Sequence, residues 1–298
     1  MKIGWIGTGV MGASMAGHLQ KAGHELFIYN RSRQKAEGLL KKGAQCYRTP
    51  GEVAREADIT FTMVGYPKDV EEVYWGEKGL LSSGGSCKIL IDMTTSHPRL
   101  ARHIAAEAEK IGIQSLDAPV SGGDVGARNA TLAIMVGGKK ETFEKVLPLF
   151  RLMGQNIALM GGPGAGQHTK MCNQILIAGT MIGVCESLLY AVMAGLDQQI
   201  VIDIIGKGAA GSWSINNLGP RIVKGDFNPG FYVEHFLKDM EIALNEAASA
   251  NLSLPGLALV HQLYLALKAQ GDGRCGTQAL YKALQRLNGQ KIIRPNAG

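Results

Sequence analysis

Residues 7–12 form the pattern G-x-G-x-x-G, directly after a short apolar run at residues 2–6 and within the start of a helical pattern at residues 10–22. In this pattern the first glycine permits a tight turn, the second lets the backbone approach a phosphate, and the third lets the helix pack against the strand. The segment therefore predicts a dinucleotide-binding loop, although a glycine-rich turn without a ligand has the same composition. The expected cofactor contacts are Gly7, Thr8, Gly9, Val10, Met11 and Gly12.

The residues after the second predicted strand, 25–29, indicate which dinucleotide is bound. An NAD-specific site has a carboxylate there, which binds the free ribose 2′-OH. This chain has Asn30, Arg31 and Ser32 instead. A guanidinium can form charge-assisted hydrogen bonds with a 2′-phosphate, and no carboxylate repels that phosphate. The sequence predicts NADP(H) as the preferred cofactor and NAD(H) as the alternative; Arg31 as a solvated surface residue is the competing interpretation.

Two further loops follow predicted strands and offer small polar groups. Ser121, Gly122 and Gly123 combine a hydroxyl with two backbone N–H groups that no Cβ hinders, and such a concavity suits a carboxylate. An ordinary polar turn is the alternative. Thr95 follows the strand at 88–93, where it can reach the nicotinamide ribose, and Val64 ends the strand at 59–64. We expect both residues to contact the cofactor.

Three polar residues share one face of an otherwise apolar predicted helix, 166–194. Lys170, Asn173 and Gln174 stand at positions i, i+3 and i+4. Such groups are costly to bury unless they meet a cleft, and a lysine near a helix N-terminus opposes the helix dipole. We therefore expect this face to line a site, while a solvated surface lysine is the simpler interpretation.

Other polar and aromatic residues have simpler explanations. His168 is expected to be structural, because no second histidine or carboxylate lies at ligand spacing, and no metal site is predicted. Lys238 and Asp239 fit an ion pair or a solvated helix face. Trp213, in a connection rich in glycine and serine, either fills the core or walls a small pocket.

The elements that carry these residues divide the 298-residue chain into two parts. As far as the glycine-rich turn at 161–164, short β-branched runs alternate with helical patterns. This alternation is typical of a parallel sheet. Beyond it almost only helical periodicity remains. We expect strands at 2–6, 25–29, 59–64, 88–93, 114–117, 132–136 and 156–159, with helices between them at 10–22, 33–42, 98–110 and 140–152. The later helices are expected at 166–194, 198–207, 215–224, 234–250, 257–269 and 277–287.

Composition excludes several other classes of protein. The net charge of +6 is dispersed, without a run of five basic residues, and aromatic residues make up 6%, so nucleic-acid binding is not expected. Five widely spaced cysteines without a C-x-x-C pair indicate neither a disulfide framework nor a zinc site, which favours the cytoplasm. The N-terminus leaves no room for a signal peptide. The apolar stretch 171–196 is interrupted by polar residues and predicts a buried core helix, not a membrane span.

Together these residues resemble the β-hydroxyacid dehydrogenase family. This family includes 3-hydroxyisobutyrate dehydrogenase, tartronate semialdehyde reductase, glyoxylate reductase and succinic semialdehyde reductase. The likeness covers essentially the whole chain, and residues 7–19, 117–138, 164–174 and 238–239 carry it. The resemblance implies an α/β fold in two domains. Residues 1–162 would form an NADP-binding, Rossmann-like domain with a doubly wound, mostly parallel sheet, and a long interdomain helix would lead into an all-α domain at 163–298, with the substrate between the domains.

The resemblance also implies roles for single residues. Lys170 falls on the family's catalytic lysine, and Ser121, Gly122 and Gly123 fall on its substrate-carboxylate loop. Asn173 falls on a substrate-orienting asparagine, and Thr95 and Lys238 on positions that contact the cofactor. Gln174 and Trp213 complete the expected substrate site. Two departures stand out: Gln174 replaces a second asparagine, as in tartronate semialdehyde reductases, and Ala130 replaces a glycine.

The sequence as a whole predicts a cytoplasmic, NADP(H)-dependent oxidoreductase that interconverts a short hydroxy acid and its semialdehyde or oxoacid. Lys170 is expected to transfer the proton. A homodimer or homotetramer is expected, with a small carboxylate as substrate. The alternative is a non-catalytic sensor or scaffold with the same fold, but such a protein has no need of a proton donor beside a carboxylate loop.

Overall fold

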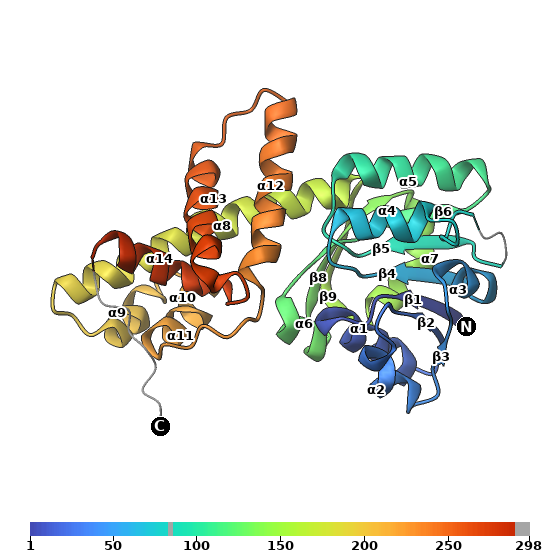
Figure 1. Ribbon diagram of the computed structural model, residues 1–298, viewed down its shortest axis with the longest axis horizontal. Helices are drawn as coiled ribbons and strands as arrows, with labels where there is room; N and C mark the ends of the chain where they lie inside the picture. Colours follow the sequence, from blue (N-terminus) through green and yellow to red (C-terminus); the bar gives the residue numbers. More distant parts are fainter. Residues whose placement is uncertain (83–85, 290–298) are drawn as a thin grey trace. The chain divides into compact units, whose positions relative to one another are not determined.

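The computed structural model describes residues 1–82 and 86–289, and the chain divides into two compact units, Met1–Lys170 and Met171–Gly298 (Figure 1). The predicted boundary was 162/163, and residues 290–298 of the predicted helical domain lie outside the described residues. The division falls later than predicted because the first turn of a long helix is hydrogen-bonded to the sheet of the first unit.

The first unit contains one sheet, with nine strands among the described residues, in the order β3-β2-β1-β4-β5-β6-β8-β7, and β9 also pairs with β8. All neighbours are parallel except the pairs that β8 forms with β6 and β7. The predicted doubly wound, mostly parallel sheet is therefore confirmed. The strands are β1 Lys2–Ile6, β2 Glu25–Tyr29, β3 Gln45–Cys46, β4 Ile59–Thr62, β5 Ile89–Asp92, β6 Gln114–Asp117, β7 Val120–Ser121, β8 Leu132–Gly138 and β9 Gly154–Gly161.

The central strands are apolar on both faces because helices cover both. Along β5, Ile89 and Ile91 enter one core and Leu90 enters the other, as the two-residue period of a strand requires. Helices α1, α2, α6 and α7 pack on the first face, and α3, α4 and α5 on the second. These helices are α1 Val10–Lys21, α2 Glu37–Leu40, α3 Pro50–Glu56, α4 Pro67–Trp75, α5 Pro98–Lys110, α6 Gly123–Asn129 and α7 Lys140–Phe150.

Several short elements of the first unit differ from the prediction. The helix expected at 33–42 is a 3₁₀ turn, Arg33–Ala36, followed by the single turn of α2. Helices α3, α4 and α6 and strands β3 and β7 were not predicted. For α3 and α4 the sequence did contain a signal, because Pro50 and Pro67 stand at the first helical position. The two-residue strands are too short to show any periodicity.

The second unit is helical throughout its described residues, as predicted. A core of apolar residues includes Phe236, Tyr264 and Tyr281, and the first two rings lie 5.2 Å apart, edge to face. The helix expected at 215–224 is two helices, because Pro220 starts a new one. The helices are α8 Ala165–Met193, which begins in the first unit, α9 Gln198–Ile205, α10 Trp213–Asn217, α11 Gly219–Val223, α12 Val233–Ser249, α13 Pro255–Leu267 and α14 Leu280–Leu287, with a π turn at Lys268–Asp272 and a 3₁₀ turn at Thr277–Ala279.

Helix α8 is less buried than predicted. One side enters the core of the second unit through residues such as Met181 and Leu188, but Leu176 and Tyr190 on the other side are mostly exposed. The helix is long and apolar enough to cross a membrane by length and composition, and 39% of its most apolar window is buried. A core helix passes the same test, so this property alone is weak support for a span. The prediction of a buried core helix holds for one face only.

Candidate active site

The glycine loop after β1 has the geometry that phosphate binding requires. Gly7 has φ +95°, and a Cβ there would collide with the Met63 carbonyl oxygen. A Cβ on Gly12 would collide with the carbonyl oxygen of Gly7, so the third glycine does allow the helix to approach the strand. By contrast, among the described residues none beyond Gly9 and its two chain neighbours has an atom within 4 Å of the position that a Cβ on Gly9 would take. The open space lies where the second glycine lets a phosphate approach.

Asn30 fixes this loop to the end of β2. Its Oδ1 accepts a hydrogen bond of 2.8 Å from the backbone N–H of Thr8, and its Nδ2 donates one of 2.7 Å to the Ser32 carbonyl. The side chain of Thr8 is buried, whereas Val10 is exposed and Met11 half-buried. Asn30 thus holds together the two segments that were predicted to bind the cofactor.

Arg31 is solvent-exposed and also paired. Its side chain is 70% exposed, and its Nη1 lies 3.1 Å from Oδ1 of Asp69. The other carboxylate oxygen of Asp69 accepts the Tyr66 N–H at the start of α4. The sequence analysis missed Asp69, although an acidic residue in the first turn after Pro67 is a helix-start signal that points to this position.

The loops after β4 and β5 are joined by Thr94. Its buried hydroxyl accepts a hydrogen bond of 3.0 Å from the Val64 N–H, and its own N–H donates to Asp92 Oδ1. Thr95, the expected cofactor contact, is half-buried. Val64 and Thr95 therefore belong to one hydrogen-bonded edge of the sheet, where ligands bind in open α/β folds.

The loop expected to bind a carboxylate lies between β7 and α6. Ser121 is half-buried, and Gly122 and Gly123 have φ of +131° and +60°, values that other residues rarely adopt. Ala130, at the end of α6, also has a left-handed conformation, with φ +56°. A glycine at this position would adopt that conformation without strain.

The polar face of α8 was predicted to line a site, and its residues are largely buried. Lys170 is 6% exposed and Gln174 is 1% exposed, so the solvated-surface interpretation of Lys170 is wrong. In the second unit, Asn173 Nδ2 donates to Gln174 Oε1 at 2.7 Å, and Gln174 Nε2 donates to Asp239 Oδ2 at 2.6 Å.

Asp239 on α12 completes this polar group. Its carboxylate is 1% exposed, and Oδ1 lies 3.1 Å from Lys238 Nζ. The ion-pair interpretation of Lys238 and Asp239 therefore holds, but the solvated helix face does not. No role of its own was predicted for Asp239, although residues 238–239 are among those that carry the family resemblance; its position beside Phe236 and Met240, on the apolar face of α12, is the signal that points to a buried carboxylate.

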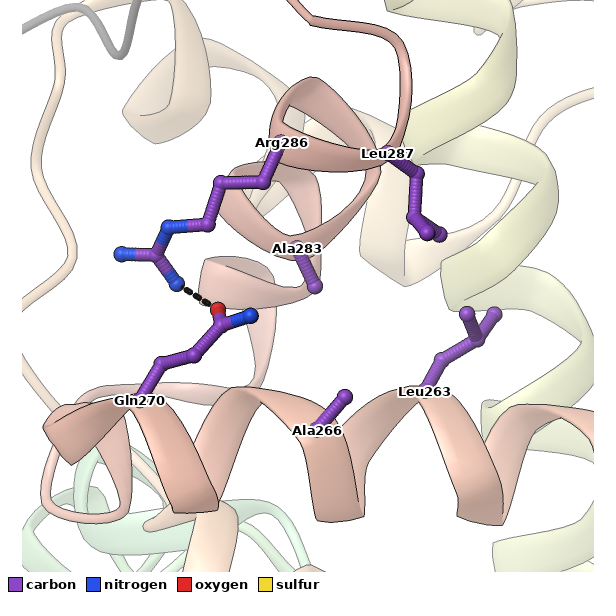
Figure 2. Close-up of a pocket in the computed structure, with 6 residues that line it drawn as sticks. All are labelled: Leu263, Ala266, Gln270, Ala283, Arg286 and Leu287. Carbon is purple, nitrogen blue, oxygen red and sulfur yellow. Dashed lines mark hydrogen bonds between the residues drawn. The ribbon is translucent and has the colours of Figure 1, made fainter.

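Trp213 and His168 are both exposed in the structure. Trp213 is 64% exposed at the start of α10, so the prediction that it could fill the core is wrong. His168 is exposed and lies 3.3 Å from Arg102. Within residues 1–82 and 86–289, no group of three His, Cys, Asp or Glu side chains could hold a metal ion. A hollow of about 230 Å³ lies in the second unit. None of the predicted site residues lines it; the residues around it, drawn in Figure 2, are Leu263, Ala266, Gln270, Ala283, Arg286 and Leu287.

Comparison with known proteins decides the family. Residues 2–162 match the NAD-binding domain of 6-phosphogluconate dehydrogenase, and residues 164–284 match the NAD-binding domain of NADP-dependent 3-hydroxyisobutyrate dehydrogenase. This chain belongs to the β-hydroxyacid dehydrogenase family. The resemblance inferred from the sequence is thereby confirmed, and the protein is an NAD(P)-dependent hydroxyacid dehydrogenase.

Relatives in this β-hydroxyacid dehydrogenase family match the chain over nearly its whole length. A probable mitochondrial 3-hydroxyisobutyrate dehydrogenase-like protein of Arabidopsis thaliana is 52% identical, over 98% of this chain and 87% of its own. The 2-hydroxy-3-oxopropionate reductase of Escherichia coli is 40% identical, over 98% and 100%. The structure of Mycobacterium tuberculosis 3-hydroxyisobutyrate dehydrogenase with L-serine has a TM-score of 0.86 at 31% identity, over 95% and 98%.

Proposed function

We propose that the protein is an NADP(H)-dependent oxidoreductase that interconverts a short hydroxy acid with its semialdehyde or oxoacid. The candidate substrates are of the 3-hydroxyisobutyrate, tartronate semialdehyde, succinic semialdehyde and glyoxylate types. The single observation that carries the proposal is Lys170, a buried lysine near the start of a helix whose same face bears Asn173 and Gln174. A lysine is buried at this cost where a proton must be transferred to or from a ligand.

The proposed mechanism assigns a task to each predicted site residue. The nicotinamide supplies or accepts the hydride when it is bound. Lys170 Nζ donates a proton to the carbonyl oxygen during reduction and accepts it from the hydroxyl during oxidation. The Ser121 hydroxyl and the N–H groups of Gly122 and Gly123 bind the substrate carboxylate. Asn173 orients the substrate, and Gln174 and Trp213 complete its site.

The cofactor is proposed to bind along the carboxyl edge of the sheet. The space beside Gly9 fits a pyrophosphate, since no atom occupies the position of a Cβ there. The loop contacts are Gly7, Thr8, Val10, Met11 and Gly12, with Asn30 and Ser32 at the adenosine end and Val64, Thr95 and Lys238 at the nicotinamide end. Arg31 is 70% exposed and paired with the Asp69 side chain, and a rotation of its side chain could bring the guanidinium to a 2′-phosphate, which supports NADP(H) over NAD(H).

A homodimer or homotetramer is proposed as the assembled form. Seven exposed residues of α8 recur at alternating spacings of four and three, which places them on one stripe, and Glu186 is the single charged residue of that stripe. Such an exposed apolar stripe marks a contact surface, and a second copy offers an apolar stripe of the same length. The stripe consists of Cys172, Leu176, Gly179, Gly183, Glu186, Tyr190 and Met193. The cytoplasm is proposed as the location, because five unpaired cysteines suit a reducing compartment.

A substrate panel tests the proposed function. Small hydroxy acids, semialdehydes and glyoxylate would each be assayed with NADPH or NADP⁺ and with NADH or NAD⁺, and matching methyl esters would serve as controls. We expect one acid to be turned over faster with the phosphorylated cofactor, and its ester to be a poor substrate because the carboxylate loop cannot bind it. Dinucleotide binding without turnover of any acid would instead favour the sensor or scaffold.

A further inference from the structure

Gln167, in the first turn of α8, uses both ends of its side-chain amide on one short loop. Its Nε2 donates a hydrogen bond of 2.7 Å to the Thr94 carbonyl, and its Oε1 accepts one of 2.9 Å from the Ser96 N–H. The side chain is completely buried. The two bonds lie on either side of Thr95, so the amide fixes the backbone of the residue that the proposed function places against the nicotinamide end of the cofactor.

Asp117, at the end of β6, fixes the helix that carries Gln167. Its Oδ1 accepts the Gly164 N–H at 2.8 Å, and its Oδ2 accepts the Gln167 N–H at 2.9 Å. A Cβ on Gly137 would collide with Oδ1 of this carboxylate, so the packing leaves it little room for another position. The carboxylate therefore caps the start of α8 and fixes it against the sheet.

Gln167 and Asp117 connect three strand ends to one helix start. Asp92, two residues before Thr94, is paired with Asp117 in the sheet register. The Thr94 hydroxyl extends the connection to Val64 after β4. Lys170 follows Gln167 by three residues, less than one helical turn, so the backbone position of Lys170 is set by the same bonds.

A buried amide at this position lowers the stability of the fold relative to an apolar side chain if packing is its only role. Burying it requires that both its donor and its acceptor find partners, and an apolar side chain of the same size would avoid that cost. Here both partners are backbone groups of one loop, on either side of Thr95. The geometry is that of a clamp on the backbone.

We propose that Gln167 is a positioning residue, which with Asp117 holds Thr95 and Lys170 at the separation that hydride and proton transfer require. This inference rests on the proposed function for the roles of Thr95 and Lys170, but the clamp itself does not. Loss of the amide should loosen the Thr95 loop and leave the adenosine end of the cofactor site, formed by the glycine loop and Arg31, unchanged.

The test compares Gln167→Met with a matched control, Gln20→Met. Methionine keeps the length of glutamine and removes both hydrogen bonds. Gln20 lies near the end of α1 in the same unit, and its Nε2 also donates to two carbonyls, those of Leu39 and Lys42, at 3.1 and 3.0 Å. The control therefore makes a similar loss of backbone hydrogen bonds, away from every predicted site residue.

Four quantities would be measured on each intact protein: the rate of amide exchange at Ser96, the Kd of NADPH, the Kd of its adenosine fragment 2′,5′-ADP, and kcat. For Gln167→Met we expect exchange at Ser96 and the Kd of NADPH each to rise about tenfold, and kcat to fall about tenfold or more, since two hydrogen bonds are lost. The Kd of 2′,5′-ADP should not change. Gln20→Met should leave all of these values at those of the wild type.

A second variant keeps the inference testable if Gln167→Met fails to fold. Gln167→Glu retains the acceptor for Ser96; its ionised carboxylate has no donor for the Thr94 carbonyl, whereas its protonated form has one. Its exchange, Kd and kcat should therefore move toward those of the wild type as the pH is lowered. Unchanged Ser96 exchange, or faster exchange with unchanged NADPH affinity and kcat, would overturn the proposal. If the wild type turned over no acid, the proposed function would fail, while exchange and the contrast between NADPH and 2′,5′-ADP would still decide whether the clamp acts.

Discussion

Asp117 and Asp239 are both almost fully buried, but backbone N–H groups hold the first and side chains hold the second. In the first unit the donors are those of Gly164 and Gln167, whose positions follow from the start of a helix. In the second unit Gln174 and Lys238 supply the contacts, and these side chains can turn about several bonds. Backbone donors thus give a fixed frame, whereas side-chain donors give a group that can rearrange around a ligand.

The largest effect is expected from a substitution of Lys170, the last residue of the first unit. Lys170→Met should lower kcat by about 10²- to 10⁴-fold, the range for loss of a general acid or base, and leave the Kd of NADPH nearly unchanged. Lys238→Met is the matched control, because this lysine is proposed to contact the cofactor: its Kd should rise more than its kcat falls. Steady-state kinetics with fluorescence titration measures both, and near wild-type kcat in Lys170→Met would exclude the mechanism.

Removing each carboxylate tests the difference between the two frames directly. Asp117→Ala leaves two buried N–H groups without an acceptor, so we expect the free energy of unfolding to fall by about 2–5 kcal/mol. Asp239→Ala removes the acceptor of Gln174 Nε2 and the partner of Lys238, but these side chains can rotate toward other partners, so we expect a smaller loss of about 1–2 kcal/mol. Chemical denaturation followed by circular dichroism compares the variants. Equal losses would show that backbone and side-chain donors are equivalent here.

The same contrast separates Asn30, bound to the Thr8 backbone, from Arg31, bound to the Asp69 side chain. In Asn30→Asp with Arg31→Ala, the carboxylate can still accept the Thr8 N–H but repels a 2′-phosphate, and the cation is lost. We expect the ratio of NADPH to NADH affinity to fall about 10- to 100-fold, toward NADH. Isothermal titration gives the two Kd values. A wild type that binds both cofactors equally would contradict the assignment of Arg31.

A smaller effect is expected where the backbone itself is strained. Ala130 has φ +56°, so Ala130→Gly should raise the free energy of unfolding by about 0.5–1 kcal/mol. Ala127→Gly, inside the same helix, is the control and should lower it, because glycine is disfavoured in a helix interior and the buried methyl group is lost. Thermal denaturation of both variants measures the signs, and destabilisation by Ala130→Gly would mean that the alanine is not strained.

The smallest effect is expected in the pH dependence of the free energy of unfolding, through the buried carboxyl of Asp117. Burial raises the pKa of Asp117, although the N–H groups of Gly164 and Gln167 act to lower it. A carboxyl whose pKa is higher in the folded than in the unfolded state loses its contribution to stability as the pH rises between the two values. The free energy of unfolding of the wild type, relative to Asp117→Asn, should therefore decrease over that interval. Denaturation series from acid to neutral pH would measure this slope, and an increase in the free energy of unfolding over that interval would contradict the expectation.

The parts of the site that sequence analysis located are those set by short-range backbone geometry. The roles of Gly7 and Gly12 follow from a six-residue pattern, and the structure contains the close approaches that the pattern requires. The contact between Gln174 and Asp239 joins residues 65 positions apart on two helices. No local spacing specifies such a contact, because it depends on how the helices pack. The core-filling alternative for Trp213 is wrong for a related reason, since the exposure of its side chain is decided by neighbours distant in the sequence.

The continuity of α8 has a consequence for how such proteins can recombine in evolution or in the laboratory. The division between the two units falls inside α8, between Lys170 and Met171. Deletion of one residue there would rotate every later residue of the helix by about 100° about the helix axis. A crossover between relatives at 162/163, where family boundaries fall, would exchange Gly164 and Gln167 while keeping their partner Asp117. A crossover just after Lys170 that keeps the helical register would instead take Asp117, Gln167 and Lys170 from the same parent. The recombined protein would then keep the helix cap, the clamp and the lysine together.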